Sequence, residues 1–145
     1  MTEHGSGFTL IELLVVLALL AITSAAAVPA LLQERHEIAE RRLVRDVAGL
    51  LATTRDLART TGRSATFVLA PTEQRYWITS GDSTAAGILS MPEDARVVRP
   101  TTARVSCSFA ADGQATPCAL TVRGTGEHTI LVNVWSGEIA VRDAR

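Results

Sequence analysis

The chain has 145 residues, of which 47% are hydrophobic, and this length suits one domain with perhaps one extra element. Its formal net charge of −1 at pH 7 argues against a general polyanion binder. Its two cysteines are too few for a metal site built from cysteines alone.

A long run of residues without a charge, Leu13 to Leu32, lies near the N-terminus. About 20 helical residues span about 30 Å, the hydrocarbon thickness of a bilayer, so this run predicts a membrane-spanning helix. A cleaved secretory signal peptide is the alternative, because Ala25-Ala26-Ala27 offers a small-residue cleavage site. Against it, residues 1–7 contain no Lys or Arg. Glu12 also lies within the apolar segment, where an acid costs about 2.5–3.5 kcal/mol at the helix centre.

The stretch around Glu12, GFTLIELL at residues 7–14, resembles the type IV pilin signature. That signature has a leader ending in Gly, then Phe, then an apolar helix with Glu four residues later. The resemblance implies that a prepilin peptidase cleaves between Gly7 and Phe8 and that Phe8 is then N-methylated. The apolar helix would stay in the mature protein as its anchor and assembly helix. The leader differs from the family pattern because it lacks a basic residue.

The resemblance also implies a role for Glu12 in assembly. Its carboxylate would pair with the ammonium group of Phe8 in the same or an adjacent subunit and set the register of helix packing. Such a pair is stronger in a low dielectric than in water, although desolvation offsets part of the gain. The alternative is an acid that is merely tolerated near the membrane interface.

The sequence after the anchor is charged but keeps a helical pattern. Exposed i,i+4 pairs such as Glu37–Arg41 suit a solvated face, and Gly62 is a plausible stop signal. We predict one helix from about Phe8 to Thr61, whose second half packs an apolar stripe on the C-terminal part of the chain. The stripe consists of Leu43, Val47, Leu50, Leu51, Leu57 and Ala58.

After Gly62 the pattern of apolar residues becomes strand-like, with turn residues between short runs, which predicts antiparallel sheets. We interpret residues 82–92 as a loop. The predicted strands are Ser64–Leu69, Arg75–Thr79, Ala95–Arg99, Arg104–Phe109, Ala119–Arg123, Thr129–Val134 and Ile139–Arg142.

Cys107 and Cys118 flank the Asp112-Gly113 turn. In an exported domain they predict one disulfide, and two buried free thiols are the alternative. His4, His36 and His128 are scattered, and no Ser or Asp has a partnered base. We therefore expect no catalytic residues, no metal site, no cofactor and no enzymatic activity.

Three further stretches resemble the H-type minor pseudopilins and the FimT-type minor pilins: DLARTTGR at residues 56–63, SFAADG at 108–113 and VNVWSGEIAV at 132–141. The resemblance implies an α+β fold, with a long N-terminal transmembrane and assembly helix and a C-terminal antiparallel β-sandwich head. The expected divisions are a leader (1–7), a transmembrane helix (8–32), its amphipathic continuation (33–62) and a periplasmic head (63–145).

By this resemblance the chain is a minor pseudopilin at or near the tip of a type II secretion pseudopilus. It would be a single-pass protein of the bacterial inner membrane with its head in the periplasm. The implied partners are other pseudopilins through the N-terminal helix, the prepilin peptidase and secreted proteins.

The alternative is a FimT-type minor pilin of a type IV pilus, because some of these bind DNA during natural transformation. Arg123, Arg142 and Arg145 are then the candidate DNA contacts. The acids Glu138 and Asp143 are interleaved with them, which weakens this hypothesis.

Overall fold

The computed structural model describes residues 9–92, 95–98 and 104–144, without the side chains of residues 25–34 and 144. The chain divides into two compact units, Met1–Arg35 and His36–Arg145. Helix α1 (Leu10–Thr61) begins in the first unit and ends in the second.

In the first unit, α1 begins directly after Thr9, whose side chain caps it. The backbone nitrogen of Glu12 donates to Thr9 Oγ1 at 3.3 Å, and threonine is a preferred residue at this position. The hydroxyls of Thr23 and Ser24 donate to carbonyls one turn earlier, such as that of Leu20. These polar side chains therefore find their partners within the helix itself.

Every large apolar side chain from Leu10 to Ile22 is exposed, from 77% for Leu10 to 46% for Val16. In the part of the chain that the structure describes, no helix is both long and apolar enough to cross a membrane. The predicted span Leu13–Leu32 extends into residues 25–34, whose side chains lie outside that part.

In the second unit, the helix buries one stripe of side chains in the core. Leu43, Val47, Leu51 and Ala58 are at most 1% exposed, and Leu50 and Leu57 pack against the same core. The prediction that this stripe packs on the strands is therefore confirmed. The opposite face is solvated, and its Glu37–Arg41 pair is open to solvent with a separation of 3.9 Å. Such an exposed pair contributes little to stability.

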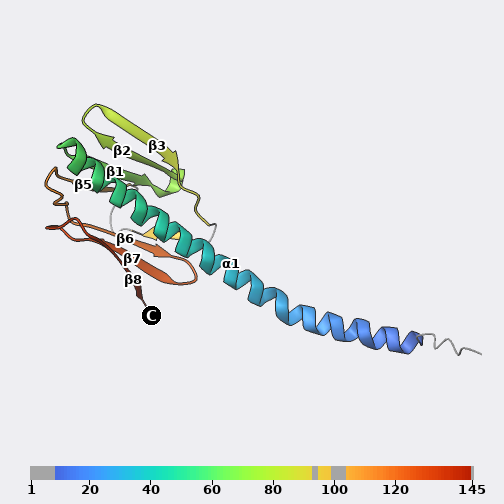
Figure 1. The fold of residues 1–145 in the computed structure, drawn as a ribbon. Coiled ribbons are helices and arrows are strands. Elements are labelled where there is room, and N and C mark those ends of the chain that lie inside the picture. The colour runs from blue at the N-terminus through green and yellow to red at the C-terminus, as the bar shows by residue number, and fades with distance from the viewer. Residues whose placement is uncertain (1–8, 93–94, 99–103, 145) are drawn as a thin grey trace, which may run out of the picture. The chain divides into compact units, whose positions relative to one another are not determined.

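The strands form two four-stranded antiparallel sheets, in the orders β3-β2-β1-β5 and β4-β6-β7-β8 (Figure 1). The α+β fold class that the sequence predicts is thus confirmed. The elements are β1 (Ala65–Ala70), the 3-10 turn η1 (Pro71–Glu73), β2 (Arg75–Ser80), β3 (Ser83–Ile88), β4 (Arg96–Val98), β5 (Val105–Phe109), β6 (Cys118–Arg123), β7 (Glu127–Val132) and β8 (Ile139–Ala144).

Alternating residues of both sheets meet in one core, as expected for strands with one buried face. In the first sheet Phe67 lies opposite Ile78 and Cys107, and in the second Leu120 lies opposite Ile130. The disulfide predicted between Cys107 and Cys118 is present, with Cα atoms 5.6 Å apart. It connects β5 of one sheet to β6 of the other, so a covalent bond ties the two sheets together.

The interpretation of residues 82–92 as a loop is wrong, because residues 83–88 form β3. This strand is the sheet edge beside β2, where Ser80 lies opposite Ser83 and Gly81 turns the chain with φ 56°. Most of its side chains are exposed, so neither face selects apolar residues and the sequence shows no alternation. The predicted strand Thr129–Val134 is shifted. β7 ends at Val132, because the Asn133 side chain accepts hydrogen bonds from the turn beyond it.

Candidate functional site

The cleavage and methylation residues Gly7 and Phe8, and the whole predicted leader 1–7, lie outside the described residues. Glu12 occupies the first turn of α1 with an exposed side chain. Acidic residues suit this position, because the first turn of a helix carries partial positive charge. The pairing of Glu12 with Phe8 stays a prediction.

The contact between the helix and the head centres on Glu40, a residue that sequence reasoning missed. Its side chain is only 1% exposed. Thr125 donates to it twice, from the backbone nitrogen to Oε1 (2.5 Å) and from Oγ1 to Oε2 (3.0 Å). The backbone nitrogen of Gly126 donates to Oε2 at 3.3 Å. Three donors from the β6–β7 turn therefore replace the water that this carboxylate loses on burial.

Gly124 makes the close approach of the turn to the helix possible. A Cβ atom at this residue would overlap the carboxylate of Glu40. The turn sequence Gly-Thr-Gly at residues 124–126 thus provides space, a hydroxyl and two backbone donors at one point. We call this arrangement the Glu40–turn contact. The sequence signals a turn here, but it does not signal which helix residue the turn receives.

A second contact joins the end of α1 to the turn at Ser136 and Gly137. The guanidinium groups of Arg55 and Arg59 lie near the carbonyls of Gly137 and Ser136, at 3.5 and 3.4 Å, which are long hydrogen bonds. Gly137 has φ 63° and approaches the carbonyl of Gly113 so closely that a Cβ atom could not fit. The helix is therefore bonded to the head at two places along its second half.

The structure brings two of the three predicted DNA-contact residues onto one surface. Arg123 of β6 and Arg142 of β8 lie on the outward face of their sheet, separated by β7. Arg96 of β4 lies directly opposite Arg123 on this face, and the sequence prediction did not include it. Glu127 pairs with Arg123 at 3.0 Å. Arg145 lies outside the described residues.

Of the two acids that weakened the DNA hypothesis, Glu138 is exposed just before β8, and Asp143 does not share the outward face. It points to the other side of β8, where its Oδ1 lies 2.6 Å from Nδ1 of His128. His128 of β7 therefore has a hydrogen-bond partner on the neighbouring strand. From β4 to β8 the outward face therefore carries Arg96, Arg123 and Arg142, together with Glu127, which is paired with Arg123.

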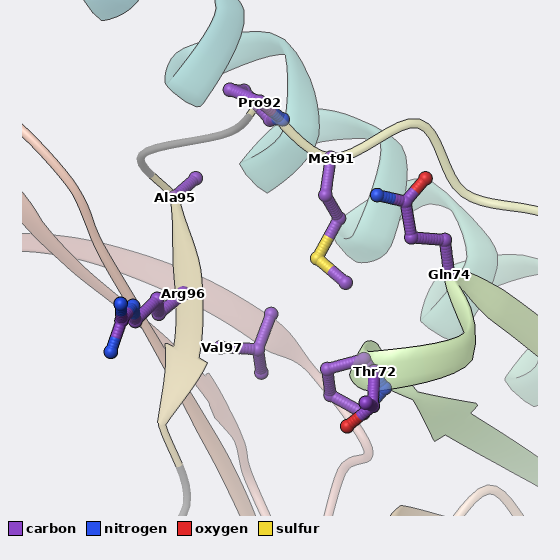
Figure 2. Close-up of a pocket in the computed structure, with 8 residues that line it drawn as sticks. Thr72, Gln74, Met91, Pro92, Ala95, Arg96 and Val97 are labelled. Atoms are coloured by element: carbon purple, nitrogen blue, oxygen red, sulfur yellow. The ribbon is translucent and has the colours of Figure 1, made fainter.

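A cavity of about 320 Å³ opens between η1 and β4 (Figure 2). Met91 and Val97 face this space, whereas Arg96 points away from Val97 (Figure 2). Among the lining residues that the structure describes, no two are acids, bases or nucleophiles that could act as a catalytic pair. Likewise, no group of three or more His, Cys, Asp or Glu side chains within the described ranges could hold a metal ion.

Residues 5–28 match the model of the prokaryotic N-terminal methylation motif. No curated protein sequence matches the chain. Among solved structures, the minor pseudopilin EpsH from the Type 2 Secretion System of Vibrio cholerae is similar, with a TM-score of 0.51 and 11% sequence identity. The match covers 72% of this chain and 96% of EpsH.

The fold is that of a pseudopilin. The methylation motif includes the predicted prepilin junction, and the pseudopilin fold has the predicted order of helix and sheets. Together these findings support a type IV pilin-like subunit.

Proposed function

We propose that the chain is a minor pseudopilin, a structural subunit at or near the tip of a type II secretion pseudopilus, rather than an enzyme. The observation that carries this proposal is the combination, in one chain, of a methylation motif at residues 5–28 with a pseudopilin fold. The Glu40–turn contact supports it, because a head bonded to its helix can follow that helix during assembly.

The proposal includes anchoring in the bacterial inner membrane before assembly, with the head in the periplasm. The exposed apolar side chains from Leu10 to Ile22 support this, because a surface of this kind is costly in water. Lipid would cover these side chains before assembly, and the N-terminal helices of other pseudopilins would cover them in the fibre. Glu12 would then pair with the amino group of Phe8 in the same or a neighbouring subunit.

Mass spectrometry of the protein purified from its own cells tests the processing step. We expect a mature chain that begins at Phe8 and carries one added methyl group. Replacing Gly7 with leucine should leave the precursor uncleaved but still inserted in the membrane. A mature chain that begins at Val28 would instead show cleavage of an ordinary signal peptide, and the proposal would be wrong.

A deletion of the gene separates the two kinds of assembly. Loss of secreted proteins from the medium, with surface pili unchanged, is the expected result for a type II secretion subunit. Loss of pili with normal secretion would assign the chain to a type IV pilus instead.

DNA binding during natural transformation is the second candidate function, and one observation favours it. Arg96 lies opposite Arg123 on an exposed sheet face that also carries Arg142. Glu127 neutralises Arg123, which leaves Arg96 and Arg142 as the cations of this face that DNA phosphates could contact. The test is a gel-shift assay at two salt concentrations. Equal retardation of DNA by the native chain and by a variant with these arginines changed to glutamine would exclude this function.

A further inference from the structure

β8 is the last strand of its sheet, so among the described residues one of its two edges is unpaired. Residues 140–143 are exposed, and Val141 keeps 46% of its surface in contact with solvent. An exposed edge strand presents N–H and C=O groups that can pair with another extended chain. Edges of this kind are often shortened, twisted or covered in soluble proteins, and this one is six residues long.

The hydrogen-bond pattern identifies the backbone groups that face the free edge. At the start of the hairpin, the nitrogen of Asn133 donates to the carbonyl of Glu138 (2.8 Å). Hydrogen-bonded pairs alternate along an antiparallel ladder, so in the observed register Ala140 and Arg142 also direct their backbone groups toward β7. The backbone groups of Val141 therefore point outward to the free edge.

A groove of about 280 Å³ runs between this edge and α1. The helix lines it with Arg41, Val44 and Arg45, and β8 contributes Val141 and Asp143. Asp143 already has a partner, because its carboxylate lies 2.6 Å from Nδ1 of His128, which also lines the groove.

The charges of this groove favour an acidic ligand. Within the described residues Arg45 forms no ion pair, and Arg41 has only the long 3.9 Å contact with the exposed Glu37. The groove holds two guanidinium groups and one carboxylate, that of Asp143, which lies 2.6 Å from Nδ1 of His128, so its cations outnumber its acids. Val141 adds an exposed apolar side chain, and Val44 lines the groove with little exposed surface.

We propose that β8 and this groove bind an extended acidic segment of a partner protein, which adds to the sheet as a fifth strand. Backbone hydrogen bonds to Val141 would hold the segment in register, as in other cases of strand addition. Its alternate side chains would enter the groove, where carboxylates meet Arg41 and Arg45 and small apolar groups meet the valines. The proposal does not depend on which fibre contains the subunit.

The test uses the full chain in detergent and a fluorescein-labelled six-residue peptide of alternating valine and glutamate. Fluorescence anisotropy at low ionic strength measures its binding. A second peptide has lysine in place of glutamate, and a third is N-methylated at every second amide. We expect the glutamate peptide to bind at least about tenfold more tightly than either, which corresponds to about 1.4 kcal/mol. Equal binding of the lysine peptide or of the N-methylated peptide would overturn the proposal.

Variants of the protein provide a second, independent measurement. Val141→Pro removes the backbone N–H of residue 141, which faces the free edge. The substitution leaves the hydrogen bonds between β7 and β8 intact, and proline is tolerated on edge strands. It should abolish binding of the glutamate peptide, whereas Val141→Thr should keep it. Arg45→Glu should weaken binding at least about fivefold, while the matched control Arg42→Glu, on a neighbouring exposed residue outside the groove, should not. Unchanged affinity in a folded Val141→Pro variant would contradict strand addition.

Discussion

The backbone nitrogen of Thr125 donates to Oε1 of Glu40 at 2.5 Å, although the two residues are 85 positions apart in the chain. Glu40 is charged and yet only 1% exposed, whereas Thr125 lies on an exposed turn, so the hydrogen bonds from the turn explain why Glu40 can be buried. Their contact fixes where along α1 the β6–β7 turn rests.

Glu40→Ala should lower the free energy of unfolding by at least about 2 kcal/mol, because it removes three hydrogen bonds to a buried, charged acceptor. Glu40→Gln should cost less, because the amide oxygen can still accept. Denaturant unfolding monitored by circular dichroism measures the change. The control is Glu37→Ala, at an exposed acid on the same helix, which should change stability by less than about 0.5 kcal/mol. Equal effects of the Glu40 and Glu37 substitutions would mean that the buried contact does not stabilise the head.

Gly124→Ala should destabilise the head, because the new methyl group would occupy the space of the Glu40 carboxylate. Gly126→Ala is the matched control, since its Cβ would lie 3.5 Å from Nε2 of His128, an ordinary contact distance. In the Glu40→Ala background Gly124→Ala should cost clearly less than in the native chain. Strict additivity in this double-mutant cycle would show that the two residues do not interact.

Replacing Cys107 and Cys118 together by alanine should cost roughly 2–4 kcal/mol, because the bridge restricts the unfolded chain and connects two sheets. Melting curves of the variant and of the native protein, each with and without reductant, provide the measurement. Reductant should lower the melting temperature of the native protein only. Labelling of fresh periplasmic protein under denaturing conditions should find no free thiol.

Glu12→Leu should leave the stability of the head unchanged and reduce incorporation into the fibre, if the carboxylate sets the register of helix packing. Glu12→Asp should restore part of the function, because the charge survives with a side chain one methylene shorter. In vivo crosslinking to neighbouring subunits, together with a secretion assay, measures both variants. Equal crosslinking and secretion with Leu or Glu at this residue would exclude the register role.

The strands that could be predicted from the sequence are those with one buried face, because burial selects an apolar residue at every second position. β1, β5 and β6 each have one face in the core, so buried residues alternate with less buried ones along them. Phe67, Cys107 and Leu120 are examples of the buried positions, and all three strands were predicted. β3 has no buried face, and its Ala85, Ala86 and Gly87 follow no pattern of alternation. It is a strand because β2 offers it an edge, which is a tertiary cause.

The candidate site divides in the same way. The junction at residues 7–14 is a local motif, so it is visible in the sequence. Glu40 lies three and seven positions before Leu43 and Val47, in line with the buried stripe, but its charge argued against the core, and only the folded chain brings Thr125 to it. Arg96 was within a predicted strand, but its position opposite Arg123 depends on the pairing of β4 with β6, which residue patterns do not determine.

The bridge between Cys107 and Cys118 also sets how far the protein can be stretched. When a fibre subunit is pulled from its ends, the tension passes through the sulfur atoms and bypasses the chain between the two cysteines, which are 11 positions apart. Those residues stay slack even after both sheets have come apart. A single-molecule extension trace of the oxidised protein should therefore end about 30–34 Å short of the reduced one, since 11 extended residues span about 36–40 Å and the bridged Cα atoms already account for 5.6 Å of this.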